Sequence, residues 1–198
     1  MIKRVRLIVW LFVALAVALA ALLWWRAEQP VRAPDSAAPV AIGAPFTLTA
    51  SDGTRFASSS LKGTPYVLFF GFTHCPDVCP TTLARLAKLR RQLGKGDTAF
   101  TMVFVTVDPE RDSPAEMARY AAAFATPIVA LTGSPAEIAA VTKSFGIYSK
   151  RVAGSGGDYN VDHTAAVLLF DRAGRFTSTI APDESDGPAL AKLARIAG

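Results

Sequence analysis

The segment PYVLFFGFTHCPDVCPTTLARLAKLRRQL, residues 65–93, decides the fold. It begins with a short continuous apolar run, typical of a strand buried on both faces, and continues from Leu83 to Leu93 with apolar residues at helical spacing. A second buried strand, AFTMVFVTVD, follows at 99–108. The region 65–108 is therefore predicted to be a βαβ unit with a right-handed crossover.

Further strands and helices are predicted around this unit. Ser113-Pro114-Ala115-Glu116 and Ser134-Pro135-Ala136-Glu137 each combine a capping box with proline at the first helical position, so a helix begins at each. The other predicted elements are a hairpin at 46–57, a strand at 127–132, paired strands at 164–171 and 175–180, and a last helix at roughly 188–196. The predicted fold class is α/β, a central mixed sheet flanked by helices.

The net charge of +5 lies mostly near the N-terminus. Residues 1–35 hold five basic and two acidic groups, which leaves sixteen basic against fourteen acidic groups in the rest of the chain. The remainder is nearly neutral and shows no basic stripe interleaved with aromatic residues. A nucleic-acid partner is therefore not expected.

The N-terminal segment has the features of a membrane anchor. Nineteen uncharged, mostly apolar residues run from Leu7 to Trp25, about the length that a helix needs to cross a bilayer. Lys3, Arg4 and Arg6 precede this run and should remain cytoplasmic, so the C-terminal part is exported. A cleaved signal peptide is the alternative. We expect an anchor at 1–26, a Pro/Ala-rich linker at 27–45 and one folded domain at 46–198.

The chain has only two cysteines, Cys75 and Cys79, and both lie where the first buried strand joins its helix. A structural disulfide, a redox pair and a pair of metal ligands all fit this arrangement. Each cysteine precedes a proline, which disfavours helical geometry, so we expect Cys79 to cap a helix whose first residue is Pro80. The positive end of that helix favours thiolate, the form that binds metal or attacks a disulfide.

The two histidines, His74 and His163, are the candidates for a further metal ligand. His74 neighbours Cys75 and should point away from the cysteine's side, as a packing residue. His163 lies just before the strand at 164–171, in a predicted loop that faces the cysteine loop in thioredoxin-like folds. Two thiolates and one imidazole suit copper, as Cu(I) or Cu(II). A structural zinc site would require a fourth ligand, for which Asp77 is the nearby candidate.

The sequence resembles the Sco (SenC) family of copper chaperones for cytochrome c oxidase. The resemblance runs from about Phe46 to Ile196 and includes FFGFTHCPDVCPTTL (69–83), VDPERDSP (107–114), LTGSPAEI (131–138) and YNVDHTAAVLLFD (159–171). It implies that Cys75, Cys79 and His163 bind one copper ion in a thioredoxin-like fold with an inserted hairpin and a single N-terminal anchor.

The resemblance also implies partners and a location. The expected role is assembly of the dinuclear copper centre of oxidase subunit II, or of another copper enzyme, with an upstream copper donor and a thioredoxin-like reductant as further partners. The expected location is a bacterial inner membrane with the domain in the periplasm; a mitochondrial inner membrane is the other location considered.

Two enzymatic alternatives follow from the same cysteines. A membrane-anchored thiol-disulfide reductase would use Cys75 and Cys79 as a redox-active pair, without carrying copper. A peroxiredoxin-like peroxidase fits less well, because Thr73 is only two residues before Cys75 and the Thr-x-x-Cys arrangement is missing.

The segment Asp108-Pro109-Glu110-Arg111-Asp112 belongs to the resemblance but has no evident catalytic role. Its acidic residues precede the helix cap at Ser113 and would complement the helix dipole there. Docking of a partner through Arg111 or the carboxylates is the alternative.

Overall fold

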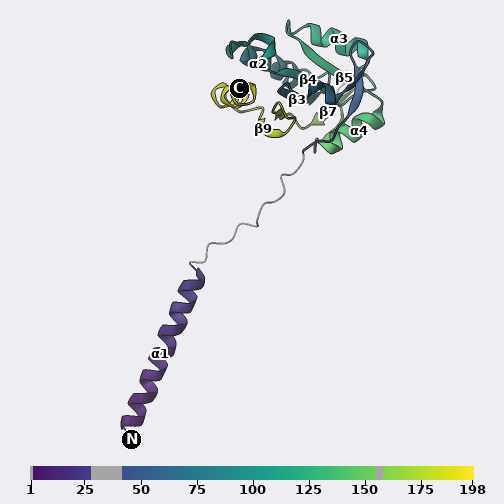
Figure 1. The fold of residues 1–198 in the computed structure, drawn as a ribbon. Coiled ribbons are helices and arrows are strands. Elements are labelled where there is room, and N and C mark those ends of the chain that lie inside the picture. The colour runs from purple at the N-terminus through teal and green to yellow at the C-terminus, as the bar shows by residue number, and fades with distance from the viewer. Residues whose placement is uncertain (1, 28–41, 155–157) are drawn as a thin grey trace. The chain divides into compact units, whose positions relative to one another are not determined.

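A computed structural model describes residues 2–27, 42–154 and 158–198 (Figure 1). The chain divides into two compact units, Met1–Val40 and Ala41–Gly198. The first unit contains helix α1 (Ile2–Ala27). Over the described part of the chain, no helix is both long and apolar enough to cross a membrane. The predicted linker at 27–45 falls mostly outside the described residues.

The second unit is built on a seven-stranded mixed sheet in the order β2-β1-β5-β4-β3-β8-β9. β3 runs parallel to β4, and β4 to β5, whereas the outer pairs are antiparallel. The strands are β1 (Thr47–Ala50), β2 (Arg55–Ala57), β3 (Tyr66–Gly71), β4 (Thr101–Thr106), β5 (Ile128–Thr132), β8 (Val167–Phe170) and β9 (Phe176–Ile180). The predicted α/β fold with a mixed central sheet is confirmed.

Helices cover both faces of this sheet. The helices are α2 (Val78–Gln92), α3 (Pro114–Ala122), α4 (Pro135–Ser144) and α5 (Asp186–Ala197), and the short 3₁₀ turns are η1 (Ser58–Leu61) and η2 (Gly96–Thr98). Val67 and Phe69 of β3 belong to the core under α2, α3 and α5, while Leu68 and Phe70 belong to the core under α4. β3 is therefore buried on both faces, as its continuous apolar sequence predicts.

A second, separate sheet consists only of β6 (Ser149–Ala153) and β7 (Tyr159–His163), paired antiparallel. This hairpin is inserted between α4 and β8. His163 is the last residue of β7, so its predicted placement in a loop is wrong. The exposed side chains of β6 give no alternating pattern from which a strand is recognised.

The start of α2 also differs from the expectation. The helix is capped at Asp77 and begins at Val78, so Cys79 and Pro80 both lie within its first turn. The first intrahelical bond runs from the N–H of Thr81 to the carbonyl of Asp77, 3.1 Å. Proline is tolerated there because N–H groups of the first turn have no helical acceptor.

The two predicted helix caps are unequal. Ser134 and Glu137 form the complete capping box, with hydrogen bonds in both directions. Ser113 accepts a hydrogen bond from the N–H of Glu116, 3.3 Å. The Glu116 carboxylate instead pairs with Arg119 on the surface, so this cap is only half of the predicted box.

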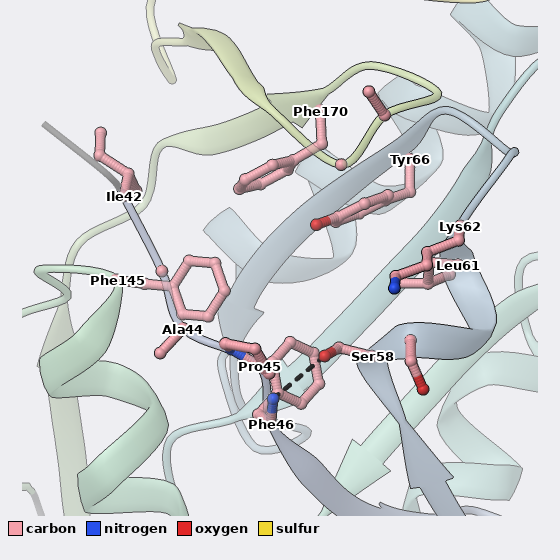
Figure 2. A pocket seen from close by; sticks show the side chains of 14 residues that line it. Ile42, Ala44, Pro45, Phe46, Ser58, Leu61, Lys62, Tyr66, Phe145 and Phe170 are labelled. Atoms are coloured by element: carbon pink, nitrogen blue, oxygen red, sulfur yellow. Dashed lines mark hydrogen bonds between the residues drawn. The ribbon is translucent and has the colours of Figure 1, made fainter. Parts of the chain in front are cut away.

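A cavity of about 410 Å³ lies against the start of the second unit (Figure 2). Its walls include Phe46, Tyr66, Phe145 and Phe170, with the Tyr66 and Phe170 rings stacked 4.6 Å apart. No cysteine or histidine is among the described residues that line it. The groups with metal-binding chemistry therefore gather elsewhere.

Candidate metal centre

Cys75, Cys79 and His163 come together at the carboxyl end of β3. Their ligand atoms, two Sγ and one imidazole nitrogen, all lie within 4.8 Å of one another. Cys79 is held in the first turn of α2, Cys75 in the preceding loop, and His163 at the end of β7. Strand ends of an open α/β sheet are where such folds place their sites.

The two cysteines are free thiols in unequal surroundings. Cys79 is completely buried, whereas Cys75 is half-buried and lines an opening of about 220 Å³ together with His163. The backbone N–H of Cys79 lies 3.4 Å from the Cys75 sulfur. An incoming group therefore reaches Cys75 before Cys79.

These surroundings separate the acidities of the thiols. The pKa of Cys75 is lowered to about 4, first by a hydrogen bond from Cys79 and further by His163, against the opposing effect of partial burial. The pKa of Cys79 is raised far above its ordinary value, because its proton is held in the bond to Cys75 and because the side chain is buried. The pair thus behaves as one thiolate and one thiol, coupled through a single proton.

The His163 ring is oriented by its own neighbour. Its Nδ1 lies 3.0 Å from the carbonyl oxygen of Thr164, which can only accept, so Nδ1 carries the hydrogen. The other ring nitrogen, Nε2, lies 3.5 Å from the Cys79 sulfur. The ring stands edge-on to Phe72, with centroids 5.8 Å apart. Nε2 is therefore the ring nitrogen that faces the two sulfurs and is placed to bind an ion beside them.

Neither His74 nor Asp77 joins this group. His74 Nδ1 contacts the Thr73 hydroxyl at 3.0 Å, and its side chain is 47% exposed. Asp77 accepts a hydrogen bond from the Thr81 hydroxyl at 3.1 Å. Over the residues that the structure describes, the clustered donors are two sulfurs and one nitrogen. That set fits a single copper ion better than a closed four-ligand zinc site.

Gly71 is a site residue that the sequence analysis missed. A Cβ atom at this position would lie 2.7 Å from the Cys79 sulfur and 2.9 Å from Phe104. The missing side chain thus makes the space in which the buried thiol sits. The signal available in the sequence was a glycine at the end of an otherwise bulky apolar strand.

The contacts of Asp108 and Asp112 show a role beside the predicted one at the helix start. Both side chains are buried, and each accepts a hydrogen bond from a distant segment of the chain. Asp112 accepts from Thr73 beside the cysteine loop, and Asp108 accepts from Tyr159 of β7. A sequence pattern does not reveal these long-range contacts.

Comparison with known proteins adds a family and its structures. The family model described as SCO1/SenC matches residues 34–198. The mitochondrial Protein SCO1 homolog 1 of Arabidopsis thaliana is 39% identical over 140 residues, which are 70% of this chain and 42% of that protein. The chain thus spans less than half the length of this relative.

Solved structures match more completely. Bradyrhizobium japonicum ScoI with copper bound is 46% identical, with a TM-score of 0.71 over 79% of this chain and 99% of that one. BsSco is 26% identical, with a TM-score of 0.61 over 78% of this chain and 92% of that one. BsSco is described as a member of the Sco family of cytochrome c oxidase assembly proteins with a disulfide switch.

Proposed function

This chain belongs to the SCO1/SenC family, and from that membership together with its Cys75–Cys79–His163 group we propose that it is a copper metallochaperone. It binds one copper ion, Cu(I) or Cu(II), through the two sulfurs and His163 Nε2. It delivers the ion to the dinuclear copper centre of cytochrome c oxidase subunit II. The relative with copper bound and the description of BsSco support this role.

One observation carries the proposal: two thiol sulfurs and an imidazole nitrogen lie within 4.8 Å of one another. Thiol exchange alone requires no histidine at the pair. Soft sulfur favours Cu(I), and the imidazole makes the site suitable for Cu(II) as well. Three protein ligands leave a position open, which an incoming ligand of the acceptor can use.

The residues divide the work of binding and release. Cys75 is already a thiolate at the opening, so it meets the ion first. Cys79 gives up its proton as the ion displaces it, and His163 closes the third side. Release also begins at the opening, where the half-buried Cys75 is the first sulfur that an acceptor thiolate can replace.

We further propose that the chain is anchored in a membrane by the apolar run from Leu7 to Trp25, with its folded domain outside the cytoplasm. The bacterial inner membrane is the proposed location. Another copper enzyme as acceptor, an upstream copper donor and a thioredoxin-like reductant complete the proposed set of partners.

A second candidate function is a thiol-disulfide reductase that acts on the oxidase cysteines without carrying copper. Cys75 is half-buried with a pKa of about 4, and its partner thiol is buried. This arrangement favours a reductase, because Cys75, as the accessible thiolate, is the sulfur that attacks a substrate disulfide. The disulfide switch described for BsSco is in keeping with this chemistry.

His163→Ala separates the two functions. The variant keeps its two thiols, so disulfide formation and reduction should remain, while Cu(II) loses its nitrogen ligand. We expect loss of the thiolate-to-Cu(II) absorption of the purified protein and a copper-deficient oxidase in cells. Normal oxidase assembly at limiting copper would favour the reductase. Cys75→Ser and Cys79→Ser impair both activities and serve as the shared negative control.

A further inference from the structure

The turn Asp108–Asp112, here called the acidic turn, joins β4 to α3 and buries two carboxylates. Asp108 is 1% exposed and Asp112 is fully buried. Burying a carboxylate is unfavourable unless hydrogen bonds compensate it, so the partners of these groups identify what the turn holds. Among those partners are Thr73, on the segment that carries the cysteines, and Tyr159, on the strand that carries the histidine.

Asp112 holds the cysteine side. Its carboxylate accepts hydrogen bonds from the Thr73 N–H (3.1 Å), the Thr73 hydroxyl (2.6 Å) and the Thr106 hydroxyl (2.5 Å). Thr73 lies two residues before Cys75, at the point where the chain leaves β3. Two bonds to one residue fix both the backbone and the side chain at the start of the cysteine loop.

Asp108 and Arg111 hold the histidine side. The Tyr159 hydroxyl donates to Asp108 (2.8 Å), and Arg111 bonds both Asp108 (2.5 Å) and the Tyr159 carbonyl oxygen (3.0 Å). The Arg111 guanidinium also lies 3.8 Å from the centre of the Tyr159 ring. Tyr159 is thus gripped at its ring, its hydroxyl and its backbone.

These contacts of Tyr159 bear on the metal site because Tyr159 and His163 lie on the same strand, β7. β7 forms a ladder with β6 alone, so no hydrogen-bond ladder sets its position against the main sheet. Tyr159 and His163 are four residues apart on this strand and therefore share a face. Val161, between them on the same face, packs in the main core. Side-chain contacts of Val161 and Tyr159 with the rest of the domain therefore set where His163 sits.

We propose that the acidic turn positions both halves of the metal site: Asp112 holds the cysteine loop through Thr73, and Asp108 with Arg111 holds His163 through Tyr159. The proposal rests on the proposed copper-binding function and adds the residues that set the geometry of its site. These are positioning residues, because they touch the segments that carry the ligands and not the ion.

The two halves predict different effects on copper. Groups that orient a metal ligand change affinity by about 10- to 100-fold when removed. Tyr159→Phe loosens the hairpin, so Cu(II) should bind about tenfold more weakly while Cu(I), held by the thiolates, changes less. Thr73→Val loosens the cysteine loop, so both oxidation states should bind about tenfold more weakly.

A double-mutant cycle with His163→Ala tests the Tyr159 arm. Copper titrations use the full chain in detergent, with a Cu(II) competitor and a Cu(I) competitor as readouts, so that affinities can be measured with and without His163. Tyr159→Phe should weaken Cu(II) binding about tenfold beside His163 and less than about twofold beside His163→Ala, since it then has no ligand to position. Asp108→Asn, which keeps the side-chain volume, should follow Tyr159→Phe.

The effect of Thr73→Val on copper affinity should not depend on His163. Thr73→Val should cost the same factor with and without His163. In the metal-free reduced protein, amide hydrogen exchange should quicken in the cysteine loop with Thr73→Val and in β7 with Tyr159→Phe. The matched controls are Tyr148→Phe and Thr179→Val, both at exposed positions, and neither should change copper binding or exchange at the site.

The possible outcomes distinguish failure of the positioning role from failure of the proposed copper-binding function. An equal cost of Tyr159→Phe in both backgrounds, or a Thr73→Val variant with unchanged affinity and exchange, overturns the positioning role. If His163→Ala leaves Cu(II) binding unchanged, the ligand assignment itself falls. Weaker Cu(II) binding in His163→Ala without coupling to Tyr159 overturns the positioning role alone.

Discussion

Gly71→Ala should damage the fold and the metal centre together. The added Cβ would stand 2.7 Å from the Cys79 sulfur and 2.9 Å from Phe104 Cε2, whereas relaxed contacts between such atoms lie at about 3.5–4.0 Å. Both neighbours are fully buried, so each has to move by roughly 1 Å through packed surroundings. Overpacking of this kind destabilises proteins by about 1–3 kcal/mol, and two rigid neighbours place Gly71→Ala near the upper end.

The metal centre should suffer because the displaced atom is a proposed ligand. A shift of about 1 Å exceeds the tolerance of about 0.5 Å within which a site keeps its geometry. We therefore expect copper affinity to fall at least about tenfold. The effect should reach Cu(I) as well as Cu(II), because the disturbed ligand is a sulfur.

The assay is urea denaturation of residues 36–198, reduced and metal-free, followed by circular dichroism. Fluorescence of tryptophan is unsuitable, since Trp10, Trp24 and Trp25 all lie in α1. Gly187→Ala in α5 is the matched control: its Cβ meets nothing within 4 Å, so it should be neutral or stabilise by up to about 1 kcal/mol.

The same substitution in a Cys79→Ala protein shows which neighbour the new methyl group meets. Without the sulfur, Phe104 is the remaining close neighbour, so Gly71→Ala should lower the free energy of unfolding by about half as much as in the wild type. A Gly71→Ala protein that unfolds within about 0.5 kcal/mol of the wild type and binds copper normally would refute the reasoning. An equal cost in both backgrounds would assign the clash to Phe104 instead.

Three further predictions concern protons, caps and topology. Cu(I) binding by His163→Ala should tighten about tenfold per unit of rising pH between pH 6 and 8. The hydrogen bond from Cys79, the largest cause of the lowered Cys75 pKa, remains in this variant, so Cys75 is already a thiolate and only Cys79 releases a proton. Competition titrations that show a hundredfold change per unit would contradict this. Ser134→Ala, which breaks a complete capping box, should destabilise the domain by about 1–2 kcal/mol, and more than Ser113→Ala, as measured by the same urea titration; the reverse order would contradict the cap assignment. A reporter enzyme fused after Gly198 should be active only outside the cytoplasm, and activity inside would overturn the proposed topology.

The central part of the fold was predictable because its signals are local. The run 65–72 is apolar at every position apart from its glycine, and β3 is buried on both faces. Asp52-Gly53, a turn signal inside the predicted hairpin at 46–57, and the proline-led caps located further elements, because each signal depends only on residues next to it. The cysteine loop was found for the same reason, at a strand-to-helix junction.

The features that the sequence analysis missed have three different causes. β6 is exposed at four of its five positions, so its sequence SKRVA carries no strand period. The predicted start of α2 was two residues too late. A residue before proline disfavours helical geometry, but in the first turn of a helix proline is tolerated because the N–H groups there have no helical acceptor. The role of Asp108 and Asp112 follows from bonds to Tyr159 and Thr73, 51 and 39 residues away.

The separate β6–β7 sheet places the cysteines and His163 under different structural constraints. A strand of the main sheet that slips by one residue turns all its side chains to the wrong face, so the segment leading into Cys75 and Cys79 tolerates little change. β7 has no register with that sheet to protect. Exchange of the segment 149–163 for one that keeps Tyr159 would alter the residue at position 163 while the thiols stay in place, so we expect the metal preference of the domain to be changeable through this one segment.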